Sequence, residues 1–292
     1  MTMPNFLIIG AMKAGTTALY ATLAQHPQIY MSPNKEPHFF THEGGKPSIS
    51  PTVVNNLADY QALFADVTDE IAIGEATPNY LVQPEVAATI HRYLPDAKLI
   101  AILRDPAERA YSHYLHRVLS RREDHADFLE AFRYNETLAA EGYYLDSYRL
   151  GGMYYENLCR YYDRFPAAQI KVVLYDDWRD DPAGTAQALF DFLGVDTAFV
   201  PDARWYYKTG KPKSALLNDV LRYVRTSNVA RPLRKLIPAN LRRNVVIGLH
   251  NRNVARETLT PEDRAMLIDL MRDDILKLQD LLGRDLSVWL RI

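Results

Sequence analysis

Cysteine is nearly absent from the sequence, since Cys159 is the only one in 292 residues. A single cysteine excludes an intrachain disulfide and any cysteine-rich metal site, and it fits a reducing compartment. Cys159 lies in a segment with a helical pattern. We therefore expect it to be a core residue and not a nucleophile.

Long apolar runs are also missing. No stretch of 18 apolar residues occurs, so no membrane-spanning helix is predicted. The apolar run at the N-terminus, Phe6 to Ile9, is too short for a signal peptide. The 48% of hydrophobic and 24% of charged residues are typical of a folded globular chain. We therefore expect a cytoplasmic protein.

Neither sign of charge dominates, because the formal net charge is −2, but the basic residues are unevenly spread. Residues 220–256 contain nine Lys or Arg and no Asp or Glu. This block fits an anionic partner, either a substrate or a membrane surface bound peripherally, and a solvated basic face is the other interpretation. Nucleic acid is not expected, because Tyr223 is the only aromatic residue in the block.

The stretch Asn5 to Pro27 has the pattern of a strand, a loop and a helix. The loop runs from Gly10 to Gly15, and Thr16 or Thr17 is expected to cap the helix. Such a turn directs backbone N–H groups and the positive end of the helix dipole at one point, where Lys13 adds a full charge. Lys13 precedes Gly15, so the order differs from the GxxxxGK[ST] P-loop. We predict a P-loop-like phosphate cradle, the alternative being a strand-turn-helix corner without a ligand.

Further along the chain, predicted strands alternate with predicted helices. The clearest strands are 98–103 and 170–175, and a well-capped last helix begins after Thr260 and ends at Gly283. Alternation of this kind predicts an α/β fold with a central parallel sheet flanked by helices in three layers. We expect a single domain, 1–292, with a core of about 5–215 and a helical, basic C-terminal extension, 216–292.

Two carboxylates are candidates for chemistry or binding. Prolines at 33 and 37 disfavour helix around Glu36. In an extended chain Glu36 and His38 project to the same side, which makes them a candidate acid/base pair. Glu75 follows the short predicted strand 71–74, at the sheet edge where parallel α/β proteins bind ligands.

A second anion site is indicated by Arg104 and Ser112. Arg104 follows the buried strand 98–103, and Ser112 lies off the apolar stripe of the next helix, on its polar face. The two side chains could converge on one anion. Alternatively, Arg104 pairs only with Asp105 or another carboxylate.

Five motifs occur in order along the chain: KAGTT at 13–17, KEPHFF at 35–40, EATPNY at 75–80, LRDPAERAYS at 103–112 and GKPKS at 210–214. With them the chain resembles the sulfotransferases that use 3′-phosphoadenosine 5′-phosphosulfate (PAPS). The likeness is to the bacterial and glycan-type branch, with its heparan sulfotransferase-like motifs, and it covers about residues 5–215.

The resemblance implies a P-loop-like fold and the transfer of a sulfuryl group from PAPS to an acceptor hydroxyl, with 3′-phosphoadenosine 5′-phosphate (PAP) as the product and no metal. Glu36 aligns with the proposed general base, His38 being the other candidate, and Lys13 would neutralise the leaving oxygen. The nucleotide would be bound by Lys13, Ala14, Gly15, Thr16 and Thr17 at its 5′ end, by Arg104 and Ser112 at its 3′-phosphate, and by Gly210, Lys211, Lys213 and Ser214, which close over that end. Glu75 and Tyr80 are expected to contact the acceptor.

The acceptor remains open between a glycan, a lipid and another small alcohol, and it is anionic if the basic block binds it. Ala76 stands where the glycan-type enzymes carry lysine, and the arginine-lysine-glycine motif of the cytosolic enzymes is missing. Three other interpretations compete: a metal-dependent P-loop kinase or NTPase, a nucleotide-binding module without catalysis, and a peripheral membrane-binding protein.

Overall fold

A computed structural model describes residues 2–44, 52–202, 211–212, 254–255 and 258–292 of the chain. Its centre is a parallel sheet of five strands in the order β2-β3-β1-β4-β5. The strands are β1 (Phe6–Gly10), β2 (Ile29–Met31), β3 (Ala72–Ala76), β4 (Lys98–Leu103) and β5 (Ile170–Leu174). β1 and β4 are buried along almost their whole length, which explains their continuous apolar runs.

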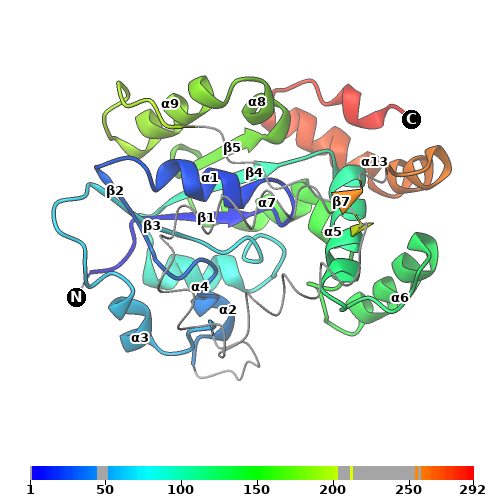
Figure 1. Cartoon of the computed structure of the whole chain (residues 1–292), viewed down its shortest axis with the longest axis horizontal. Coiled ribbons are helices and arrows are strands. Elements are labelled where there is room, and N and C mark those ends of the chain that lie inside the picture. Colours follow the sequence, from blue (N-terminus) through cyan, green and yellow to red (C-terminus); the bar gives the residue numbers. More distant parts are fainter. Residues whose placement is uncertain (1, 45–51, 203–210, 213–253, 256–257) are drawn as a thin grey trace.

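Helices flank the sheet, as Figure 1 shows, so the predicted three-layer α/β fold is confirmed. Ten α-helices are described: α1 (Thr16–Leu23), α2 (Phe39–His42), α3 (Leu57–Ala62), α4 (Val86–Tyr93), α5 (Pro106–Leu119), α6 (Phe128–Ala140), α7 (Tyr154–Tyr162), α8 (Tyr175–Asp180), α9 (Pro182–Leu193) and α13 (Pro261–Leu282). Short 3₁₀ turns are η1 (Leu150–Gly152), η2 (Ala167–Gln169) and η3 (Ser287–Leu290). A second, antiparallel pair joins β6 (Lys211–Pro212) to β7 (Val254–Ala255).

The strand order places three chain segments at one edge of the sheet. β1 lies between β3 and β4, and all three run in the same direction. The loops that follow them are therefore neighbours, and backbone bonds join them: Leu81 N–H donates to Ile9 O (2.9 Å) and Ala11 N–H to Ile102 O (2.7 Å). This carboxyl edge is where ligands bind in open parallel sheets.

The last helix, α13, packs against α5 and α7. Its inner face is apolar and buried, and Trp289 in η3 is buried with it. Thr260 caps the helix by accepting from Asp263 N–H (3.1 Å), and Gly283 ends it with φ 59°. The start after Thr260 and the end at Gly283 were both predicted. None of the described helices is long and apolar enough to cross a membrane.

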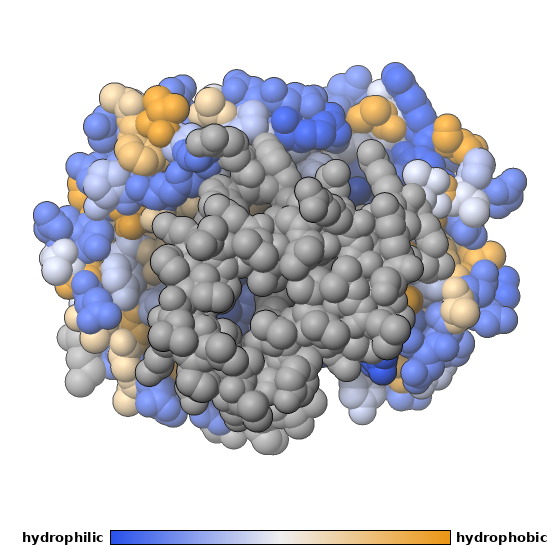
Figure 2. Space-filling model, viewed as in Figure 1, coloured by the Kyte–Doolittle hydropathy of each residue, from blue (hydrophilic) through white to orange (hydrophobic). Residues whose placement is uncertain are grey.

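On the face shown in Figure 2, the described residues are mainly hydrophilic, with apolar residues scattered in small groups. The most exposed large apolar side chains, Val200 and Ile292, lie far apart in the sequence. Isolated apolar residues of this kind are normal on a protein surface.

Candidate active site

The loop between β1 and α1 forms the predicted cradle. Gly15 has φ 105° and Lys13 has φ 70°, so the chain turns sharply before α1 begins at Thr16. No described side chain caps the helix, and the prediction of a Thr16 or Thr17 cap is wrong, because Gly15 occupies the N-cap position. Among the described residues no acceptor takes the N–H groups of Gly15, Thr16 and Thr17. Those donors, at the positive end of the helix, are available to an anion.

The remaining member of the predicted cradle, Ala14, is buried, and its N–H donates to Ala11 O at 3.1 Å. That bond closes the turn just before the N–H groups of Gly15, Thr16 and Thr17. Ala14 therefore shapes the loop, while its neighbours carry the free donors.

Tyr175, the first residue of α8, links the cradle to the second anion site. A Cβ atom at Gly15 would lie 3.1 Å from the Tyr175 ring, so only glycine lets the loop approach the ring this closely. On the same residue, the Arg104 guanidinium lies 5.3 Å from the ring centroid. The loop and Arg104 therefore both contact Tyr175.

Arg104 is anchored by its backbone and paired by its side chain. The Tyr154 hydroxyl donates to Arg104 O at 2.9 Å, and Arg104 N–H donates back at 3.4 Å. Its Nη2 donates to Glu108 Oε2 at 3.1 Å, so in this structure Arg104 has a carboxylate partner, as the alternative interpretation expected. Both side chains of this pair keep some exposure, at 24% and 43%. A partly exposed pair of this kind is weak enough to be exchanged for a phosphate.

Ser112 is buried, which the helical pattern had not predicted, because α5 is covered on that face as well. Its Oγ has no hydrogen-bond partner among the described residues. One turn earlier, Arg109 is completely buried, with Nη2 donating to Tyr148 O, while Nε and Nη1 find no partner in the described part of the chain. Buried polar groups without partners are costly, so this face of α5 is suited to receive a polar ligand.

Cations gather around the cradle. Burial, with a smaller contribution from the neighbouring charge of Arg104, lowers the pKa of Lys13 to about 8, while Glu36 acts in the opposite direction. Burial, together with Arg109, also holds the pKa of His113 well below its usual value, so this histidine is neutral. Within the described part of the chain Lys13 makes no ion pair. An anion bound here would relieve the repulsion between the cations.

Glu36 and His38 lie together, but not for the predicted reason. The segment is not extended, since φ is 65° at Glu36 and 57° at His38, values that are uncommon outside glycine. His38 Nε2 lies 3.8 Å from Glu36 Oε2, and Lys35 Nζ pairs with the other carboxylate oxygen. Glu36 N–H donates to Ala76 O (3.0 Å), which fixes this loop beside the end of β3. Burial lowers the pKa of His38.

Glu75 and Tyr80, the residues expected to contact the acceptor, are both completely buried, and that contact stays a prediction. Glu75 accepts from Thr77 Oγ1 (2.8 Å) and from the Tyr60 hydroxyl (3.4 Å). Burial raises its pKa to about 7, and the Glu36 charge acts in the same direction. Glu75 therefore supports the end of β3 from behind the loop that carries Glu36.

The predicted closing segment Gly210–Ser214 is described only at Lys211 and Pro212, which form β6, while Lys213 and the rest lie outside the described residues. β6 lies against α5, the helix that carries Ser112. The basic block 220–256 lies outside the described residues except for β7.

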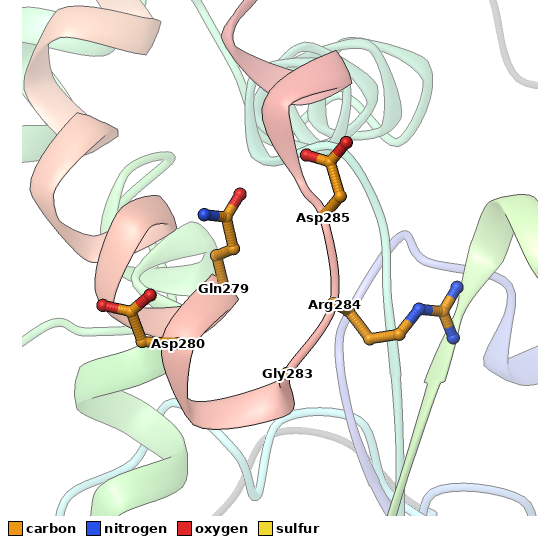
Figure 3. A pocket seen from close by; sticks show the side chains of 5 residues that line it. All are labelled: Gln279, Asp280, Gly283, Arg284 and Asp285. Carbon is orange, nitrogen blue, oxygen red and sulfur yellow. The ribbon is translucent and has the colours of Figure 1, made fainter.

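A shallow pocket at the end of α13 contains none of the predicted site residues. It is lined by Gln279, Asp280, Gly283, Arg284 and Asp285 (Figure 3). Arg284 points away from the other labelled side chains, and it donates to both carboxylate oxygens of Asp177 at 3.0 Å. This hollow is separate from the cradle.

Sequence reasoning missed three residues of this site: Tyr154, Tyr175 and Arg109. Arg109 lies inside the motif 103–112, and Tyr175 directly follows a predicted strand, so both had a positional signal. Tyr154 had none, because only the packing of α7 brings its hydroxyl to Arg104.

Residues 3–210 match the family model described as "Sulfotransferase domain". Human heparan sulfate glucosamine 3-O-sulfotransferase 3B1 is 32% identical over 209 residues, which are 72% of this chain and 50% of that protein. The chain thus spans about half the length of the curated relatives it matches. A crystal structure of a sulfotransferase from Alicyclobacillus acidocaldarius is similar over 100% of both chains, at 30% identity and a TM-score of 0.77. Mouse sulfotransferase SULT7A1, complexed with PAP, shares the fold at 15% identity and a TM-score of 0.51, over 93% of this chain and 84% of that one.

Proposed function

The chain belongs to the sulfotransferase domain family, and from this premise we propose that it transfers the sulfuryl group of PAPS to an acceptor hydroxyl and releases PAP. The observation that carries the proposal is the pair of anion-binding positions that share Tyr175. One is the cradle of Lys13 and the free N–H groups of α1, and the other is Arg104 with the unpartnered Ser112 hydroxyl. PAPS carries anionic groups at its 5′ and 3′ positions, so its two ends match these two positions.

Bound in this way, PAPS would supply a sulfuryl group whose transfer breaks one sulfur–oxygen bond and leaves negative charge on the 5′-phosphate. Lys13 and the N–H groups at the start of α1 would stabilise that charge, because they are fixed in place before the reaction begins. The partial burial of Lys13 strengthens this effect, since fewer water molecules screen it.

Glu36 is the proposed general base. The acceptor oxygen must lose its proton as it bonds to sulfur, and a carboxylate beside the transferring group can take that proton. Lys35 holds Glu36 Oε1 and leaves Oε2, which faces His38, for the acceptor. His38 is the alternative base, since burial favours its neutral form.

The acceptor is proposed to be an alcohol, and a glycan hydroxyl is the first class to test. Heparan sulfate is named in the human relative, but Ala76 replaces the lysine that the glycan-type motif carries, so we do not extend that acceptor to this chain. An anionic acceptor bound by the basic block 220–256 remains part of the proposal. The cytoplasmic location also stays a prediction, which cell fractionation would test.

The decisive experiment compares Glu36→Gln with Glu43→Gln, a second carboxylate of the same segment that pairs with Arg92 instead. We expect Glu36→Gln to lower the rate of sulfate transfer from radiolabelled PAPS by roughly a hundredfold or more, while PAP still binds. Glu43→Gln should remain active. Full activity of Glu36→Gln would move the base to His38 or to another residue, and failure of the wild type to bind PAP would refute the proposed function.

Metal dependence separates this function from a P-loop kinase or NTPase. A kinase recruits Mg²⁺ to neutralise phosphate charge, whereas a sulfuryl group carries less charge, which Lys13 and backbone donors can balance. We expect PAP affinity and sulfate transfer to be unchanged by EDTA. Loss of both in EDTA, with recovery on addition of Mg²⁺, would favour the kinase.

A further inference from the structure

The surroundings of Arg104 contain two carboxylates that would compete with a phosphate. Glu108 Oε2 accepts from Arg104 at 3.1 Å, and Asp105 is the next residue in the chain. Asp105 Oδ1 also caps α5 by accepting from the N–H groups of Ala107 (2.9 Å) and Glu108 (3.1 Å). An anion site that contains two anions needs additional positive charge before it can bind a phosphate well.

Arg264, from α13, supplies that charge. Its Nη2 lies 2.6 Å from Asp105 Oδ2, and its Nη1 lies 3.9 Å from Glu108 Oε1. Its Nε donates to Arg291 O at 2.6 Å, so the guanidinium is held from three sides. The Arg264–Asp105 pair is well shielded, at 16% and 13% exposure, and is therefore screened less by salt than a surface pair.

Two described arginines pair with the carboxylates of Asp105 and Glu108. Arg104 and Arg264 together balance Asp105 and Glu108 in the structure. Without Arg264 the group would carry one surplus negative charge next to the position proposed for the 3′-phosphate. Asp105 would also lose the partner of its Oδ2. Because Asp105 caps α5, the start of the helix that carries Ser112 would then be held less firmly.

We propose that Arg264 is a positioning residue of the 3′-phosphate subsite: it neutralises Asp105 and Glu108, so that Arg104 is able to exchange Glu108 for the phosphate. This inference rests on the proposed function, since it assumes that the bound nucleotide is PAP. It assigns a role in nucleotide binding to a residue beyond 210, where the family match ends. The C-terminal helix would then contribute to substrate recognition as well as to packing.

The test measures the affinities of PAP and of adenosine 5′-phosphosulfate, which lacks the 3′-phosphate, by calorimetry at low ionic strength. Arg264→Met keeps most of the side-chain length and removes the charge. We expect PAP affinity to fall roughly tenfold, as one uncompensated charge implies, with adenosine 5′-phosphosulfate unchanged. Arg264→Lys should retain most of the PAP affinity. The matched control, Arg272→Met, removes an exposed arginine of the same helix that pairs with Asp269 and should change neither affinity.

A second substitution distinguishes charge balance from simple loss of structure. In the Arg264→Met background, Glu108→Gln removes the surplus negative charge and should restore most of the PAP affinity. If Arg264→Met had instead lost affinity through a folding defect, Glu108→Gln would not restore it. Unchanged PAP affinity in Arg264→Met, equal losses for both nucleotides, or no recovery in the double variant would each overturn the inference. Failure of the wild type to bind PAP would instead refute the proposed function, so the two failures are distinguishable.

Discussion

At the scale of single residues, Lys13 is a cation whose charge changes in an accessible pH range. Its pKa is about 8, lowered chiefly by burial. A bound anion favours the protonated form, so nucleotide affinity should be constant below this pKa and should fall as the pH rises through it. We expect the affinity for PAP to drop roughly tenfold between pH 7.5 and pH 9, measured by equilibrium dialysis.

The variant Lys13→Gln should bind PAP weakly at both pH values and show no such drop. Lys277→Gln, on the outer part of α13, should retain the drop, because Lys277 lies over Tyr155 and not in the cradle. A wild-type affinity that is the same at pH 7.5 and pH 9 would contradict the assignment of Lys13 to the nucleotide.

The buried carboxyl group of Glu75 leads to a prediction about how the free energy of unfolding depends on pH. Its pKa is about 7 in the folded chain, against 4.5 for the exposed group, because the side chain is buried. As the pH rises from 4.5 to 7, the unfolded chain loses this proton first, so the free energy of unfolding should fall by on the order of 3 kcal/mol. Above pH 7 this contribution is constant.

Glu75→Gln should abolish that fall, since the amide does not titrate while its oxygen still accepts from Thr77. Urea unfolding of both proteins at pH 5 and pH 7.5 measures the difference, with the exposed Glu262→Gln as a control. If the free energy of unfolding falls equally in the variant and the wild type between the two pH values, the raised pKa of Glu75 is contradicted.

At the scale of elements, regular segments were predictable and the site loops were not. β4 has the predicted bounds and α13 begins and ends at the predicted caps, because an apolar run marks the strand and a threonine and a glycine mark the helix locally. The prolines around Glu36 correctly excluded helix, but they could not reveal its positive φ or the bond from Glu36 N–H to Ala76 O. Local signals determine where an element begins, whereas loop conformations depend on contacts between distant segments.

The first turn of α7 is capped by a residue of another helix. Asp274 of α13 is buried and accepts from the N–H groups of Tyr155 and Glu156, both at 3.0 Å. A carboxylate at a helix N-terminus satisfies free donors and interacts favourably with the helix dipole. We expect Asp274→Ala to lower the free energy of unfolding by about 1–3 kcal/mol, as measured by urea denaturation.

Asp274→Asn should be milder than the alanine variant, because the amide oxygen can still accept one of the two bonds. Asp269→Ala, on an exposed part of the same helix, is the control and should be close to neutral. Equal stabilities for Asp274→Ala and Asp269→Ala would show that the cap does not stabilise the docked helix.

At the scale of the whole molecule, the site is assembled from segments that are far apart in the sequence. The resemblance assigns Lys13, Glu36 and Arg104 to one nucleotide site, which stays a prediction. The parallel sheet brings their loops together, since β1, β3 and β4 end side by side and Glu36 N–H donates to Ala76 O at the end of β3. No signal in the sequence pointed to Arg264, because no motif covers α13 and an ion pair between residues 105 and 264 depends on tertiary packing alone. Motifs thus locate the core of a site, while packing decides which distant residues support it.

The single domain proposed for residues 1–292 makes the last prediction. The segment 258–292 lies beyond the family match, yet its helix α13 packs against α5 and α7, and it buries a row of large apolar side chains: Leu267, Ile268, Met271, Ile275, Leu278, Leu286 and Trp289. Each such side chain contributes roughly 1.5–3 kcal/mol, and the total stability of a domain is only about 5–15 kcal/mol. A chain ending at residue 257 should therefore fail to fold, which circular dichroism and gel filtration would detect. A truncated chain that stays monomeric and unfolds cooperatively would instead mean that the core is an independent domain and that α13 is an appendage.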